Sequence, residues 1–137
     1  MIPIWVLDTN VIVAALLSPG GPPGRLLDAV LEGRYLQLAL DDRIEAEYKD
    51  VLFRKKFHFE LSHVEGFFSI LPYQQRIIVS PLPPIQLPDP TDLPFLEVAS
   101  LLDDPILVTG NAKHFPASLV GKVKILSPRQ AWELLTS

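Results

Sequence analysis

The chain has no cysteine, and this absence excludes several kinds of protein. Without a thiol there is no disulfide framework, no thiolate metal site and no cysteine nucleophile, and the composition is compatible with the cytoplasm, where we expect the protein to be. Hydrophobic residues make up 48% of the 137 positions, which is enough for a buried core and argues against disorder. The length fits one domain, which we place at residues 1–137.

Long hydrophobic runs are also missing. The first apolar run, at residues 4–17, is too short to cross a bilayer and is interrupted by Asp8, Thr9 and Asn10. No basic segment precedes it, so it does not have the form of a signal peptide, and we expect no membrane association. The net charge of −4 argues mildly against a protein that coats nucleic acid non-specifically. It does not exclude an enzyme whose acidic site is neutralised by metal ions.

Several common catalytic patterns are absent. His58, His63 and His114 form no HxH or HxxxH pair, which argues against a histidine zinc site. No serine lies in a G-x-S-x-G context, and Gly20-Gly21 lacks both the lysine of a P-loop and the spacing of a dinucleotide fingerprint. We interpret His63 as part of a helix start. We interpret His114 as a surface-loop residue, although it follows a strand end and could reach a phosphate.

Short apolar segments alternate with helical ones along the chain. The predicted strands are Ile4–Leu7, Tyr35–Leu40, Arg76–Val79, Pro105–Val108 and Val123–Leu126. Between and after them, apolar residues recur at helical spacing. Such alternation predicts βαβ units and an α/β fold, with a parallel sheet covered on both faces.

Local signals indicate where some helices begin. Asp41 or Asp42 offers an N-cap, Ser62 to Glu65 has the spacing of a capping box, and Ser127 is followed by proline at N1 and glutamine at N3. Five of the ten residues at 81–90 are proline, which predicts a stiff extended connection.

Polar residues follow two of the predicted strands directly. Asp8-Thr9-Asn10 comes after the first strand and Thr109-Gly110-Asn111 after the fourth, while Asp92 opens a helix. In open α/β sheets ligands bind outside the carboxyl ends of the strands. Carboxylates that converge there repel one another unless a cation joins them, and Mg²⁺ or Mn²⁺ suits a site made of oxygen ligands. Such a site usually handles phosphates.

Each acid also fits a purely structural interpretation. Asp8 could be a turn residue that caps the next helix, and Asp92 is well placed as an N-cap, although capping and catalysis are compatible. Glu45 and Glu47 flank opposite edges of an apolar helical stripe, and Asp50 points further away. Helical periodicity does not choose between the two glutamates.

Four segments together resemble a known family. They are VLDTNVIVAAL, RIEAEYKDVLFRKKF, DPTDLPFLEVA and ILVTGNAKHFP, in this order and over nearly the whole chain. The resemblance is to the PIN-domain family, in particular to VapC-like toxins of type II toxin–antitoxin systems. It implies a three-layer α/β/α sandwich with a central parallel sheet of about five strands. It also implies an Mg²⁺- or Mn²⁺-dependent nuclease, mostly acting on RNA, with three or four acids in one cleft.

The resemblance assigns roles position by position. Asp8 matches the first family acid, Glu47 the acid of an E-x-x-x-V-L pattern, and Asp92 the acid before the FLExA helix, so these three residues are the expected metal ligands. The fourth acid usually follows T-G, where this chain has Asn111. An amide brings no charge, so the resemblance favours one metal over two, with Asn111 still in the catalytic group.

Other residues receive lesser roles. Thr9, Asn10 and Thr109 match or adjoin polar positions that support the acids or the attacking water. The spare acids Asp89, Glu97 and Asp104 rank low as replacements. Candidates for contacting the RNA backbone are Arg43, Lys49, Arg54, Lys55, Lys56, Lys113 and His114, although residues 54–56 also fit a solvated helix end.

The implied partners are RNA, a small antitoxin protein and a second copy in a homodimer. Two alternatives stay open: a catalytically inactive PIN-like binding module, in which Asn111 marks a decayed site, and a nuclease acting on DNA. A receiver-like phosphoacceptor domain fits less well, because no second acid stands beside Asp8.

Overall fold

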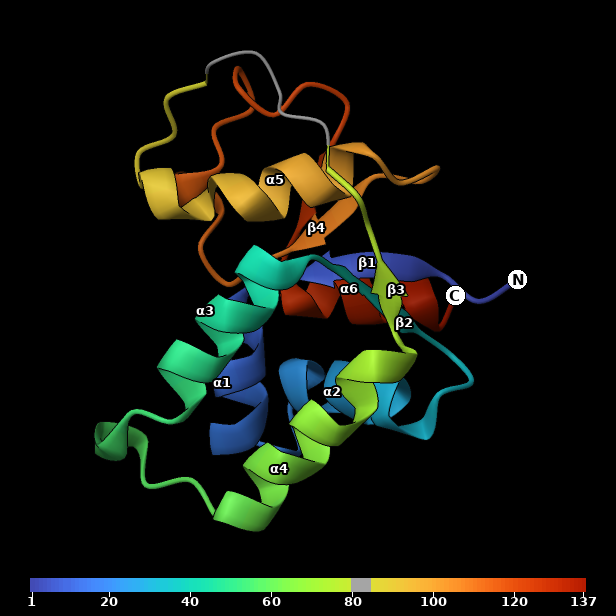
Figure 1. The fold of residues 1–137 in the computed structure, drawn as a ribbon. Coiled ribbons are helices and arrows are strands. Elements are labelled where there is room, and N and C mark those ends of the chain that lie inside the picture. Colours follow the sequence, from blue (N-terminus) through green and yellow to red (C-terminus); the bar gives the residue numbers. More distant parts are fainter. Residues whose placement is uncertain (80–84) are drawn as a thin grey trace.

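Five strands form one parallel sheet in the computed structural model, which describes residues 1–79 and 85–137 (Figure 1). The strands are β1 (Ile4–Leu7), β2 (Gln37–Leu40), β3 (Gln75–Arg76), β4 (Ile106–Val108) and β5 (Lys124–Leu126). Their order across the sheet is β3-β2-β1-β4-β5, and every pairing is parallel. The predicted α/β fold with a five-stranded parallel sheet is confirmed.

Helices cover both faces of this sheet. They are α1 (Thr9–Leu17), α2 (Pro22–Glu32), α3 (Asp42–Leu52), α4 (Leu61–Ile70), α5 (Leu93–Ser100) and α6 (Pro128–Leu135). Helix α5 packs on β1, β2 and β4, and α2 packs against both α1 and α6. Figure 1 shows α5 above the sheet and α1, α2 and α4 below it, which makes three layers. Among the described residues, no helix has both the length and the apolar composition that a membrane crossing requires.

Strand β1 has the predicted bounds, and the other four strands are shorter than predicted. The prediction of Arg76–Val79 is wrong in its extent, because β3 ends at Arg76 after a last ladder bond from the Ile77 N–H to Leu40. This strand lies at the sheet edge with β2 as its neighbour. Ile77 and Val79 still pack against the core, whereas Ile78 between them is exposed. Part of the predicted proline-rich connection, residues 80–84, lies outside the described residues, and residues 85–89 contain neither helix nor strand.

Two of the three predicted caps are confirmed. The Asp41 carboxylate accepts from the Ile44 N–H at 3.0 Å, and Ser127 forms a complete capping box with Gln130. The capping box predicted at Ser62 is wrong. Helix α4 begins at Leu61 with Glu60 at the cap position, so Ser62 is already helical, whereas a capping residue stands just outside the helix with extended backbone.

Strand order marks the carboxyl ends of β1 and β4 as the expected place for a ligand. The chain runs from β1 outward to β2 and β3 on one side, then crosses back to β4 and β5 on the other. The connections that follow β1 and β4 lead to opposite sides of the sheet. Ligands of α/β sheets usually bind at such a point, outside the carboxyl ends of the two strands. Val6, Leu7 and the whole of β4 are fully buried, so these strand ends are held rigidly.

One buried tyrosine contacts the carboxyl end of β1 from helix α3. Tyr48 on α3 is fully buried, donates a hydrogen bond to the Leu7 carbonyl, and packs its ring against Phe67 and Phe95 with centroids 5.5 and 6.4 Å away. Leu7 is the last residue of β1, directly before Asp8.

Replacing this hydroxyl tests its contribution to the fold. We expect Tyr48→Phe to lower the free energy of unfolding by about 1–2 kcal/mol, because a buried carbonyl loses a partner. Urea unfolding followed by circular dichroism measures this. Tyr73→Phe, at an exposed tyrosine, is the control and is expected to change stability by less than about 0.5 kcal/mol. Equal stability of the two variants would show that the Tyr48 hydroxyl does not stabilise the strand end.

Candidate active site

Asp8 lies at the carboxyl end of β1 and is 4% exposed. Its Oδ1 accepts from the Thr9 N–H at 2.8 Å, which caps α1. Its Oδ2 accepts from the Thr109 hydroxyl at 2.8 Å and from the Asn10 amide at 3.2 Å. The capping interpretation of Asp8 is therefore confirmed for Oδ1, while Oδ2 faces a polar cluster.

The two polar strand ends are joined to each other, because β1 and β4 are neighbours in the sheet. The Asp8 N–H donates to the Val108 carbonyl at 2.9 Å. The Asn10 Oδ1 accepts from the Gly110 N–H at 2.9 Å, and the Thr109 hydroxyl accepts from the Asn111 N–H at 3.0 Å. Thr9, Asn10 and Thr109 thus hold the Asp8 carboxylate from both strands.

Glu47 reaches this cluster from α3, where its carboxylate accepts a short hydrogen bond from the Thr9 hydroxyl. Glu45 instead pairs with Arg76 and, at 3.4 Å, with Lys49. Asp50 is exposed and pairs with Arg54 at 3.0 Å. The structure therefore makes the choice that helical periodicity leaves open, and it places Glu47 beside Asp8.

Asp92 is 7% exposed and stands just before α5, but it does not cap that helix. The chain enters α5 through a 3₁₀ turn at Pro90–Asp92, and Asp89 caps this turn by accepting from the Thr91 N–H at 3.0 Å. The backbone at Asp92 is already helical, whereas a capping residue is extended, so the N-cap interpretation of Asp92 is wrong. Its carboxylate is therefore not used in capping the helix.

His114 lies in the connection after β4 with its side chain still 36% exposed, and it also contacts Asp92. Its Nδ1 is 2.9 Å from the Asp92 Oδ2, and its Nε2 is 2.9 Å from the Asn111 amide nitrogen. A 3₁₀ turn at Ala112–His114 brings Asn111 and His114 together. Donor atoms of Asp89, Asp92 and His114 all lie within 4.8 Å of one another. Sequence reasoning missed this contact, because His114 and Asp92 belong to different segments and no spacing rule connects them.

The lesser candidates come from several parts of the fold, and Asp104 precedes the amino end of β4 rather than its carboxyl end. Arg43 pairs with Asp41 at 2.8 Å and with the buried Glu97 at 2.7 Å, so Glu97 ties α5 to α3. Asp104 pairs with Lys124 at 3.5 Å. Lys113 is exposed in the turn beside His114. Arg54, Lys55 and Lys56 follow the end of α3.

Negative charge at the site is poorly balanced. Burial and the charge of Asp92 raise the pKa of Asp8 to about 6, against hydrogen bonds from Thr109 and the Thr9 N–H. Burial and the charges of Asp8 and Asp89 raise the pKa of Glu47, and burial and Asp89 raise that of Asp92. The groups that donate to Asp8 are all neutral. A divalent cation fits these residues, because it would offset the repulsion and prefers carboxylate oxygens.

The chain was then compared with known proteins. The family description "PIN domain" matches residues 5–113, which is most of the chain and includes Asp8, Glu47, Asp92 and Asn111. The chain belongs to the PIN-domain family. PIN domains are generally metal-dependent nucleases, and the acidic cluster is compatible with that activity. No curated protein and no solved structure matches the chain.

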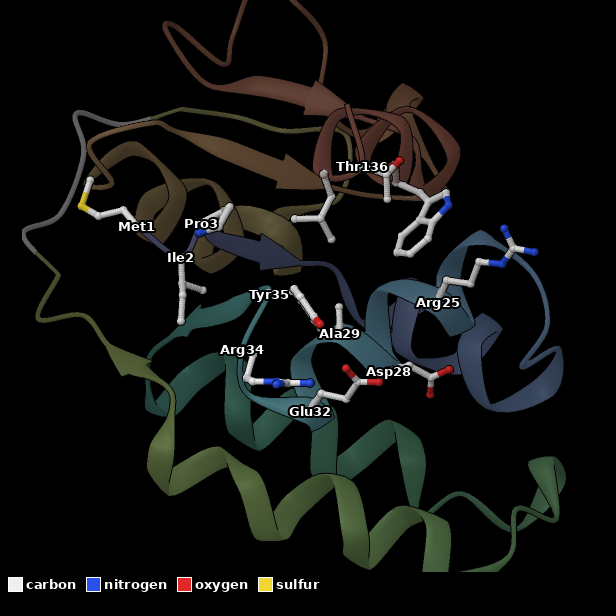
Figure 2. A pocket seen from close by; sticks show the side chains of 12 residues that line it. Met1, Ile2, Pro3, Arg25, Asp28, Ala29, Glu32, Arg34, Tyr35 and Thr136 are labelled. Atoms are coloured by element: carbon white, nitrogen blue, oxygen red, sulfur yellow. The ribbon is translucent and has the colours of Figure 1, made fainter.

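A separate cavity of about 650 Å³ lies elsewhere on this PIN domain (Figure 2). It is lined by residues 1–3 and by parts of α2 and α6, with Arg25 over the Trp132 ring at 5.9 Å and Arg34 over the Tyr35 ring at 5.5 Å. Residues 1–3 precede β1, so this cavity opens at the amino end of that strand, whereas the acids follow its carboxyl end. The cavity and the acidic cluster share no residue.

The raised pKa of Asp8 predicts a specific pH dependence of stability. Between the ordinary value of 3.8 and about 6, the folded state keeps a proton that the unfolded state has released. The protonation of Asp8 therefore stabilises the folded state fully below pH 3.8. This stabilisation, of up to about 3 kcal/mol, is lost as pH rises through 6. Asp8→Asn removes this titration, so the metal-free variant should gain stability relative to the native protein over that pH range.

Urea unfolding in EDTA at pH 4, 5, 6 and 7 measures the difference. Asp50→Asn, at an exposed aspartate on α3, is the matched control and should give a nearly constant difference from the native protein. A pH-independent difference for Asp8→Asn as well would contradict the raised pKa.

Proposed function

We propose that this PIN domain is an Mg²⁺- or Mn²⁺-dependent endoribonuclease that hydrolyses phosphodiester bonds of RNA, and that it is the toxin of a toxin–antitoxin pair. One observation carries the nuclease proposal. Asp8 and Asp92 are buried, Glu47 is bonded to Thr9 beside Asp8, and all three come from different segments and have raised pKa values. Carboxylates that are buried close together, so that their pKa values are raised, are typical of a functional site.

Asp8, Glu47 and Asp92 would hold the cation. When bound, it lowers the pKa of water and neutralises the charge that builds on the phosphoryl oxygens. The protein orients the ligands: Thr109 and the Thr9 N–H hold Asp8, the Thr9 hydroxyl holds Glu47, and His114 holds Asp92. A carboxylate whose pKa is raised towards neutrality is also suited to take the proton of the attacking water.

The RNA substrate and the toxin role rest on the resemblance to VapC-like proteins. Arg43, Lys49 and Lys113 are the proposed contacts to the phosphate backbone, whereas His114, the fourth candidate, has Asp92 and Asn111 at its two ring nitrogens. Arg43 already binds Glu97, and Lys49 binds Glu45, so Lys113 is the better candidate of the basic residues. The same reasoning supports a cytoplasmic protein with a small antitoxin partner and, in the family manner, a homodimer.

An inactive binding module is the second candidate, because Asn111 stands where the fourth family acid usually lies. The three other acids keep the cluster negative, and this favours an active enzyme. DNA is the alternative substrate, since phosphate contacts position either nucleic acid in the same way.

A cleavage assay tests the function. Purified protein is incubated with single-stranded RNA, structured RNA and single-stranded DNA, in Mg²⁺, in Mn²⁺ and in EDTA. Asp8→Asn and Glu47→Gln run beside it, prepared identically. We expect metal-dependent RNA cleavage that falls by at least about 100-fold in both variants, because each removes a metal ligand.

Glu45→Gln is the matched control, since Glu45 lies on the same helix but faces Arg76. It should retain cleavage within about twofold of the native rate, because it touches neither Asp8 nor Thr9. Cleavage that persists in Asp8→Asn would identify a contaminating ribonuclease. Absence of any metal-dependent cleavage would favour the binding module, and preference for DNA would correct the substrate.

A further inference from the structure

We propose that His114 is a nitrogen ligand of the divalent cation and that Asn111 is the residue that orients it. This inference rests on the proposed metal-dependent function and deepens it. It assigns to the chain a mixed oxygen and nitrogen ligand set, with His114 in the place left by the missing fourth acid. It also gives Asn111 a role other than that of a decayed ligand.

The spacing of the donor atoms fits this ligand set. Neighbouring ligands of an octahedral cation, each about 2.1 Å from the metal, lie about 3.0 Å apart. The His114 Nδ1 is 2.9 Å from the Asp92 Oδ2, and Asp89 adds an oxygen within 4.8 Å of both. The His114 Nδ1 and the Asp92 Oδ2 therefore have the separation of adjacent ligands, and a cation bound to both would take the place of the Nδ1 proton.

The turn that carries His114 holds it in place. Asn111 and His114 are three residues apart in a 3₁₀ turn, where side chains at this spacing lie one above the other. The His114 N–H donates to the Asn111 carbonyl at 3.1 Å, and the next residue, Phe115, is buried. The imidazole is thus fixed against Asp92 by its own backbone and by the core.

Asn111 completes the arrangement through the other ring nitrogen. A histidine that ligates a metal usually donates its second N–H to an acceptor, which fixes the tautomer. The Asn111 amide lies 2.9 Å from Nε2, and a half-turn of the amide presents Oδ1 to an Nε2–H. In that tautomer the proton is on Nε2, and Nδ1, on the side of Asp92, carries the lone pair that binds a cation.

The ligand set has a consequence for metal choice. Imidazole in place of a carboxylate lowers the negative charge that a hard cation such as Mg²⁺ depends on, and it supplies a nitrogen that transition metals accept. We therefore expect tighter binding of Mn²⁺ than of Mg²⁺, and we expect His114 to carry much of that difference.

The test uses Mn²⁺ alone as the probe, added to the metal-free full chain. Pulsed electron paramagnetic resonance detects a ¹⁴N nucleus bound directly to Mn²⁺, independently of any activity. The native protein should show this nitrogen signal, and His114→Gln should lose it and bind Mn²⁺ about 10-fold or more weakly. Mg²⁺ binding, measured by competition, should change less.

Two further variants complete the design. His63→Gln is the control, since His63 is an exposed histidine in the first turn of α4, and it should keep both the signal and the affinity. Asn111→Ala should keep the signal and weaken Mn²⁺ binding, because only the orienting partner is lost. Thermal unfolding of each variant shows that it is folded.

The outcomes separate the two proposals. Mn²⁺ bound by the native protein without a nitrogen signal would overturn the role of His114 and leave the carboxylate site intact. Failure of the native protein to bind Mn²⁺ at all would overturn both proposals. Unchanged Mn²⁺ affinity in Asn111→Ala would overturn the orienting role of Asn111 alone.

Discussion

The hydrogen bond from the Thr109 hydroxyl to the Asp8 carboxylate joins two residues that are 101 positions apart in the chain. It exists because β1 and β4 are neighbours in the sheet and both run in the same direction, so that both residues follow a carboxyl end. Every other feature of the site is arranged around this junction. Asp8 is buried there, and burial without a cationic donor raises its pKa to about 6.

The other two acids depend on how α3 and α5 are held. Glu47 comes from α3 and Asp92 precedes α5, and the ion pair between Arg43 and the buried Glu97 connects these helices directly. Arg43 lies in the first turn of α3 and Tyr48 lies further along the same helix. The Arg43 ion pair and the hydrogen bond from the Tyr48 hydroxyl therefore hold α3 at two points along its length. Arg43, a candidate contact for nucleic acid, therefore also helps to set the distance between Glu47 and Asp92.

The turn after β4 shows which side chains stand at the position of the missing fourth acid. Asn111 does not simply leave a gap, because its amide meets His114, and His114 meets Asp92. The same short turn thus carries an amide and an imidazole where the family usually has one acid. The net effect is less negative charge at the site, with no fewer groups able to face a cation.

Patterns within short segments determined much of this protein. The apolar runs of four residues, the capping aspartate at Asp41 and the capping box at Ser127 depend on local backbone geometry and burial, and all were readable from the sequence. The position of Asp8 at a strand end was equally local. The extent of β3 was not, because an edge strand continues only as far as its single neighbour holds it.

Tertiary structure alone decided which side chains meet. Glu45 and Glu47 are equivalent by helical angle, and only the packing of α3 beside β1 selects Glu47. Asp92 is not used as a cap because Asp89 caps the preceding turn. His114 contacts Asp92 because α5 packs on β4, which brings the start of the helix near the turn that follows the strand. These contacts link segments that are distant in the chain, and such contacts follow from how whole helices and strands pack, which no local pattern records.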